Sequence, residues 1–195
     1  MLSDDLYTGP QHARTVREQI LDAAYFFVSR AREIDGVRRI ALLGSITTSK
    51  PSPKDLDLLV WLPDDLGLEA LAALSRRTLG RVNQTGNRRG CDVFVADVAN
   101  RYLGRICMWR TCEPYVRQSC FAEHCGRRKF LKDDLQDIAL SATLIHAPPV
   151  GVWPSIVLRR EVPSDVRRFL HRLDADRSER PAVRRSSVDW PNIPA

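Results

Sequence analysis

Residues 39–65, RIALLGSITTSKPSPKDLDLLVWLPDD, decide how this chain folds. One apolar run, residues 40–43, ends at Gly44 and Ser45, and a second apolar run opens with Asp55-Leu56-Asp57. Short apolar runs that are bounded by turn residues are typical of buried strands. The stretch therefore predicts two strands joined by a polar loop that contains two prolines.

Two carboxylates stand at the head of the second predicted strand. Side chains at positions i and i+2 of a strand share a face, so Asp55 and Asp57 point the same way. Such a pair is costly at the start of a buried strand unless a positive charge meets it. Oxygen ligands of this kind suit Mg²⁺ or Mn²⁺, so the pair predicts a divalent cation site.

The end of the first predicted strand is suited to an anion. A tight turn at Gly44 leaves the backbone bare, so that amide groups and the Ser45 hydroxyl can face a phosphate. If a helix begins at Ser45, its N-terminus adds a favourable dipole. Phosphate donors beside a carboxylate pair describe a site for a metal–nucleotide complex.

Gly44-Ser45, nine intervening residues and then Asp55-Leu56-Asp57-Leu58 resemble the G-[GS]…D-x-D signature of polymerase-β-like nucleotidyltransferases. The minimal, stand-alone members of that superfamily are the nearest match, and the resemblance covers roughly residues 37–97. It implies an α/β (α+β) fold, with helices packed on a small mixed sheet. It also implies transfer of a nucleoside monophosphate from an NTP to a hydroxyl by a two-metal mechanism.

The same resemblance implies residue roles. Asp55 and Asp57 would hold two Mg²⁺ (or Mn²⁺) ions, and Gly44 and Ser45 would hold the triphosphate of the NTP. A third catalytic carboxylate comes from a later adjoining strand in these enzymes, and Asp92 in the predicted strand 91–98 fits that place better than Asp97. Asp92 would then bind the acceptor-side Mg²⁺ and orient or deprotonate the acceptor hydroxyl. The alternative for Asp92 is an ordinary residue at a strand start. An Asp92 side chain turned away from Asp55 and Asp57, or an arginine already neutralising the trio where the divalent ions should sit, would end the transferase hypothesis.

The loop after Gly44 and Ser45 departs from the family pattern. Relatives usually carry an Arg and a second Gly there, whereas this chain has Ile-Thr-Thr-Ser at 46–49. Lys50 and Lys54 are candidates for contacts to the nucleotide phosphates, with solvated loop lysines as the alternative. The altered loop supports a rival function, a catalytically degenerate nucleotidyltransferase fold that acts as an antitoxin-like or nucleic-acid-binding module.

Length and charge limit the classes of protein. The chain has 195 residues, enough for one main domain with a core, and a net charge of +6 favours polyanionic partners or nucleotides. No apolar stretch has the length of a membrane helix, and the N-terminus has no signal pattern. We therefore expect a cytoplasmic protein without a membrane partner. The acceptor of the transferred nucleotide stays open between a protein, an RNA and a small molecule.

Residues 101–129 are rich in arginine, with interspersed aromatics. This composition suits nucleic-acid binding, although the aromatics could equally form a small core while the arginines face water. Four of the five cysteines lie here, at Cys107, Cys112, Cys120 and Cys125. Two pairs with equal spacing suggest a structural Zn²⁺ site, and buried free thiols are the alternative.

Helical spacing of apolar residues predicts a helix between Pro10 and Gly36, another over 68–79 that Gly80 closes, and a last one from Ser164. Alternation favours a strand over 138–145, with a helix as the alternative. Residues 1–100 then form the nucleotidyltransferase-like core, 101–173 form a basic part that completes the same domain, and 174–195 form a disordered tail.

Overall fold

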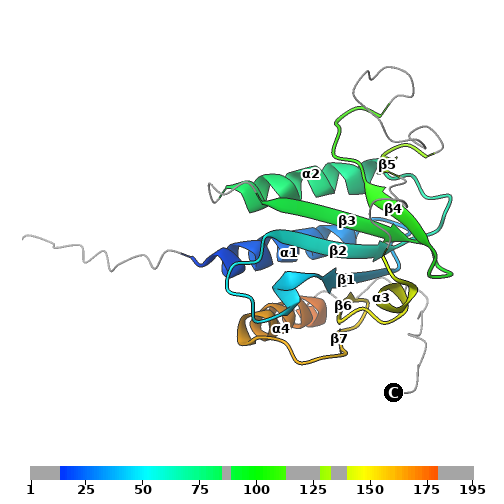
Figure 1. The fold of residues 1–195 in the computed structure, drawn as a ribbon. Coiled ribbons are helices and arrows are strands. Elements are labelled where there is room, and N and C mark those ends of the chain that lie inside the picture. Colours follow the sequence, from blue (N-terminus) through cyan, green and yellow to red (C-terminus); the bar gives the residue numbers. More distant parts are fainter. Residues whose placement is uncertain (1–13, 85–88, 113–127, 133–139, 180–195) are drawn as a thin grey trace, which may run out of the picture.

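The computed structural model describes residues 14–84, 89–112, 128–132 and 140–179 (Figure 1). Within them the chain forms one mixed sheet of seven strands, with helices packed on it, which confirms the predicted α+β class. The helices are α1 (Val16–Ala31), α2 (Glu69–Asn83), α3 (Ala142–His146), α4 (Ser164–Glu179) and a short 3₁₀ helix, η1 (Ser45–Thr47). The strands are β1 (Arg39–Leu43), β2 (Asp55–Trp61), β3 (Gly90–Ala96), β4 (Tyr102–Ile106), β5 (Leu131–Lys132), β6 (Val150–Trp153) and β7 (Val157–Leu158).

The strand order is β5-β4-β3-β2-β1-β6-β7, and β2 and β3 are the parallel pair. Parallel neighbours need a crossover connection, which α2 provides between them. Because β1 runs antiparallel to β2, the end of β1 lies at the same edge of the sheet as the starts of β2 and β3. The topology thus brings three segments that are distant in sequence to one edge.

The two faces of the sheet are covered differently. On one face Leu56, Leu58 and Val60 of β2 pack in the main core with residues of α1, α2 and α4. On the other face Leu59 and Trp61 belong to a smaller cluster that α3 covers. Figure 1 shows α2 beside β3 and β4, and α4 towards β6 and β7. Asp55 and Asp57, which alternate with Leu56 and Leu58, lie on the face of the smaller cluster.

The helices depart from the predicted bounds in several places. Helix α2 runs through Gly80 to Asn83, because Val82, buried in the main core, continues the apolar face of the helix past that glycine. The predicted strand over 138–145 is wrong at its described end, where Ser141 caps α3 instead. Helix α4 continues to Glu179, so residues 174–179 of the predicted tail are helical. Pro10 lies outside the described residues.

Helix α1 begins at Val16 because Thr15 and Glu18 form a capping box. The Thr15 side chain accepts from the Glu18 amide, and the Glu18 carboxylate accepts from the Thr15 amide at 2.9 Å. Glu18 also lies in the first turn, where its charge complements the helix dipole. None of the described helices is both long and apolar enough to cross a membrane.

We expect Thr15→Ala to lower the free energy of unfolding by about 1 kcal/mol, because the Glu18 amide loses the Thr15 hydroxyl that accepts from it. Urea denaturation followed by circular dichroism measures the change. Thr15→Ser keeps the hydroxyl and should remain close to the wild-type value; an equal loss in both variants would show that the cap is not the cause.

Candidate functional site

The three predicted catalytic carboxylates lie at the edge where β1 ends and β2 and β3 begin. Asp57 pairs with Asp92 across the parallel β2–β3 ladder and with Leu43 across the β1–β2 ladder. Asp55 lies two residues before Asp57 on the same face, opposite Gly90. Cross-strand partners project to the same side of a sheet, so all three carboxylates share one face. The structure therefore brings Asp55, Asp57 and Asp92 together.

Two glycines make room for these carboxylates. A Cβ atom on Gly44 would lie 2.0 Å from Oδ2 of Asp57, and one on Gly90 would lie 2.6 Å from Oδ1 of Asp55. The Gly90 amide donates to that same Asp55 oxygen at 2.9 Å. Gly44 has φ +69° and ψ −161°, a conformation that is open essentially to glycine alone. At both positions the carboxylate rests against bare backbone.

Burial and the repulsion of neighbouring carboxylates disfavour the ionised form of the Asp57 carboxylate at this edge. The pKa of Asp57 is raised from 3.8 to about 6, first by burial, then by the negative charge of Asp92 and then by that of Asp55. Arg105 acts in the opposite direction. Among the described residues, no Lys, Arg or His forms an ion pair with Asp55 or Asp57. The arrangement therefore favours the binding of an added cation.

Arg105, on β4, reaches the third carboxylate. Its Nη1 donates to Oδ1 of Asp92 at 2.9 Å, and both side chains are partly buried, at 21% and 32% exposure. Arg105 pairs with Phe94 of β3, which lies two residues after Asp92 and on the same face. In the sequence Arg105 is one of several arginines of the basic segment 101–129. No local pattern marks it, because the β3–β4 register alone sets this contact.

Asp92 is thus already paired with the Arg105 guanidinium, so it is less available as a ligand for the expected metal ion. Within the described part of the chain, no group of three or more His, Cys, Asp or Glu side chains could by itself hold a metal ion. Mg²⁺, however, is usually held by one or two carboxylates together with substrate phosphates and water. Asp55 and Asp57, beside the open backbone at Gly44, fit a Mg²⁺ or Mn²⁺ ion that arrives with a nucleotide.

Of the predicted nucleotide-binding residues, two lie at the carboxylate edge and two lie in the exposed loop. Gly44 is exposed and Ser45 half-buried at this edge, whereas Lys50 and Lys54 are exposed loop residues. A helix does begin at Ser45, but η1 has only three residues and is too short to build a macrodipole that would attract a phosphate. What distinguishes this end of the site is the bare turn at Gly44.

Three arginines that sequence reasoning missed hold the loop between β1 and β2. Arg17 of α1 donates to the carbonyls of Ile46 and Lys50 at 2.9 and 2.7 Å and pairs with Asp165 of α4. Arg89 donates to the Pro53 carbonyl and Arg160 to the Thr47 hydroxyl. Each contact joins residues that are more than 25 positions apart, so no sequence pattern could have shown them.

Asp97, the less favoured candidate, lies away from this edge. It is 2% exposed, and it accepts from the backbone amide of Arg101 at 2.8 Å and from its guanidinium at 2.6 Å. These bonds close the turn between β3 and β4, where Asn100 has a positive φ of 62°. The choice of Asp92 over Asp97 therefore agrees with their placement.

The basic segment 101–129 is only partly described. Arg101, Arg105 and Arg128 pair with Asp97, Asp92 and Asp64 respectively, which leaves fewer free charges for a nucleic acid.

The predicted zinc ligands are also only partly described. Cys107 and Cys112 are buried and form no disulfide bond, and Cys112 Sγ accepts from the Phe130 amide at 3.2 Å. Cys120 and Cys125 lie outside the described residues, so the zinc prediction stays a prediction.

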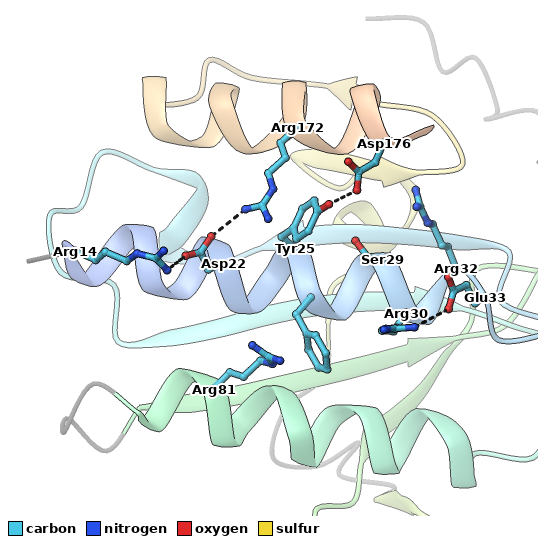
Figure 2. Close-up of a pocket in the computed structure, with 11 residues that line it drawn as sticks. Arg14, Asp22, Tyr25, Ser29, Arg30, Arg32, Glu33, Arg81, Arg172 and Asp176 are labelled. Carbon is cyan, nitrogen blue, oxygen red and sulfur yellow. Dashed lines mark hydrogen bonds and ion pairs between the residues drawn. The ribbon is translucent and has the colours of Figure 1, made fainter. Parts of the chain in front are cut away.

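A hollow of about 420 Å³ lies on the helix-covered face, between α1, α2 and α4 (Figure 2). Asp22 pairs there with both Arg14 and Arg172, and the Arg172 guanidinium stacks on Tyr25 at 3.6 Å. Asp22 is thus shared between two arginines, one just before α1 and one on α4. The sheet separates this hollow from the carboxylates, so it does not belong to the candidate site.

No curated protein and no solved structure matches the chain. One family model matches residues 4–133, which include β1, β2, β3 and β4 and with them all three carboxylates and Arg105. The match covers two thirds of the chain, and the chain belongs to this family, a family of unknown function (DUF6932).

Proposed function

We propose that this protein is an NTP-dependent nucleotidyltransferase that transfers a nucleoside monophosphate to a hydroxyl acceptor. The observation that carries the proposal is the meeting of Asp55, Asp57 and Asp92 on one face, against the bare turn at Gly44. Carboxylates that are crowded in this way require a cation, and a nucleoside triphosphate delivers one as its magnesium complex.

In this proposal Asp55 and Asp57 bind the metal–nucleotide complex, and the backbone at Gly44 and Ser45 contacts the phosphates. Bound Mg²⁺ would neutralise the negative charge that builds up on the phosphates during transfer. The acceptor oxygen attacks the α-phosphorus, a new P–O bond forms, and the bond to the bridging oxygen breaks. Pyrophosphate leaves with that electron pair, while the proton of the acceptor hydroxyl passes to a carboxylate of the site.

The Arg105 guanidinium does not cancel the charge of the site. One positive charge offsets one of three carboxylates, and the pKa of Asp57 remains raised to about 6 although Arg105 acts to lower it. Asp55 and Asp57 therefore keep the electrostatic need for a cation. The pairing of Asp92 with Arg105 differs from a trio that is open to two metal ions.

That pairing also favours a second candidate, the catalytically degenerate module that binds nucleic acid or a partner protein. The loop residues 46–49, which lack an arginine of their own, favour it as well. Such a module would keep the fold and the basic charge without turnover. The two candidates differ in their dependence on metal and nucleotide.

The test is to incubate the protein with each of the four α-³²P-labelled NTPs, Mg²⁺ and a lysate of its source, and then to locate the label. We expect covalent label on an acceptor, equimolar release of pyrophosphate and complete loss of both with EDTA. Asp55→Asn is the matched variant and should not transfer label.

The degenerate candidate gives a different result. Salt-sensitive binding to RNA or DNA without pyrophosphate release would support it, because contacts to phosphates release counterions. Absence of both label transfer and thermal stabilisation by any Mg²⁺–NTP would contradict the transferase.

A further inference from the structure

Arg105 is held in place by the sheet on both sides. On β4 it pairs with Phe94 of β3 and with Lys132 of β5, so its backbone is fixed by two ladders. Its Nη1 lies 2.9 Å from Oδ1 of Asp92, and its side chain is 21% exposed. A charge-assisted bond of this length between partly buried partners is stronger than a bond between neutral groups.

The position of that guanidinium is informative. Asp92 stands directly beside Asp57 in the β2–β3 register, whereas Arg105 comes from the strand on the other side of Asp92. Lys132, the cross-strand partner of Arg105, projects to the same face. The edge therefore has a negative side on β2 and a cationic side on β4 and β5, with Asp92 between them.

We propose that the Arg105 guanidinium takes the place of a second divalent cation at Asp92, so that the site binds one divalent ion with each nucleotide, at Asp55 and Asp57. This inference rests on the proposed function and deepens it. Arg105 occupies Oδ1 of Asp92, so a divalent ion on the other oxygen of that carboxylate would lie close to the guanidinium, and like charges at such a distance repel. Arg105 is then a positioning residue that fixes Asp92 beside the acceptor.

The arrangement has a consequence for the reaction. An arginine guanidinium is a permanent positive charge in proteins, and chelators do not remove it, unlike a bound ion. The charge at Asp92 is thus permanent, and only the ion that accompanies the nucleotide is exchanged in each turnover. Removing the Arg105 charge should open Asp92 to a second ion.

The test counts bound Mn²⁺ by electron paramagnetic resonance after equilibrium dialysis of the full chain with Mn²⁺ and α,β-methylene analogues of the four NTPs. For the analogue that binds, we expect one Mn²⁺ per bound analogue in the wild type and two in Arg105→Gln. The double variant Arg105→Gln, Asp92→Asn should return to one ion, since the second ligand is gone. Arg105→Lys keeps the positive charge and should also bind one.

The control is Arg177→Gln, which removes the same charge from an exposed position on α4 and should leave the count at one. A thermal melt of each variant establishes that it is folded. Two ions in the wild type, or one ion in folded Arg105→Gln, would overturn the inference while the transferase proposal stands. Failure of every Mn²⁺–analogue complex to bind would overturn both.

Discussion

Replacing Asp57 by asparagine will lower the rate of nucleotide transfer by about 10³-fold or more, and it will stabilise the protein in the absence of metal and nucleotide. The loss of rate follows because catalysis of this kind is mostly charge neutralisation and positioning, and a neutral amide at this position would be a poor ligand for the metal–nucleotide complex. The gain in stability follows from the crowding of Asp57 by burial, Asp92 and Asp55.

The gain in stability should depend on pH in a defined direction. The folded-state pKa of Asp57 is raised from 3.8 to about 6, so the folded protein keeps a proton there that the unfolded chain has already lost. Wild-type stability is therefore favoured at low pH and declines as the pH rises from about 4 to about 6. At pH 7 the asparagine variant avoids this penalty, roughly 2–3 kcal/mol, and near pH 4 the two proteins should be equally stable.

Urea unfolding at pH 4 and pH 7 measures this difference, and pyrophosphate release measures the loss of rate. Asp65→Asn, at an exposed position after β2, is the control and should change neither quantity by more than about 0.5 kcal/mol or twofold. Saturating Mg²⁺ and NTP should stabilise the wild type and not Asp57→Asn. A variant that kept full activity would contradict the assignment of Asp57.

Replacing Gly44 by alanine will destabilise the fold by about 2–4 kcal/mol and weaken binding of the metal–nucleotide complex. Two causes add. The backbone at Gly44, with φ +69° and ψ −161°, is strained for any residue with a Cβ, and that Cβ would lie 2.0 Å from Oδ2 of Asp57. The Asp57 carboxylate must therefore leave its place opposite Asp92.

Gly80→Ala is the matched control, because Gly80 lies inside α2 and a Cβ there meets no atom within 4 Å. Alanine in a helix should stabilise the protein by roughly 0.5–1 kcal/mol and leave nucleotide binding unchanged. Urea unfolding and titration with Mn²⁺–nucleotide give both quantities. If Gly44→Ala left stability and nucleotide binding as unimpaired as Gly80→Ala does, the close approach of Gly44 and Asp57 would not matter for folding or binding.

Periodicity was sufficient for the elements with a strong local signal. Strands β1 and β2 and the first three quarters of α2 follow from apolar runs and their flanking turns. Periodicity failed where the local signal was weak and packing against the rest of the fold decided the conformation. Residues 140–145 alternate like a strand, but Ser141 caps a short helix whose Ile145 fills the smaller cluster on the sheet. Gly80 reads as a stop signal, yet an exposed helix surface tolerates it.

By itself the sequence determined that Asp55 and Asp57 share a face at the start of a strand and that Gly44 turns the chain before it, since both follow from spacing within a few residues. Only the tertiary structure decided that Asp92 stands beside Asp57 and that Arg105 binds Asp92. Those two facts depend on the parallel pairing of β2 with β3 and on the register of β4. Pairing and register are set by packing of the whole sheet, which no single stretch of sequence encodes.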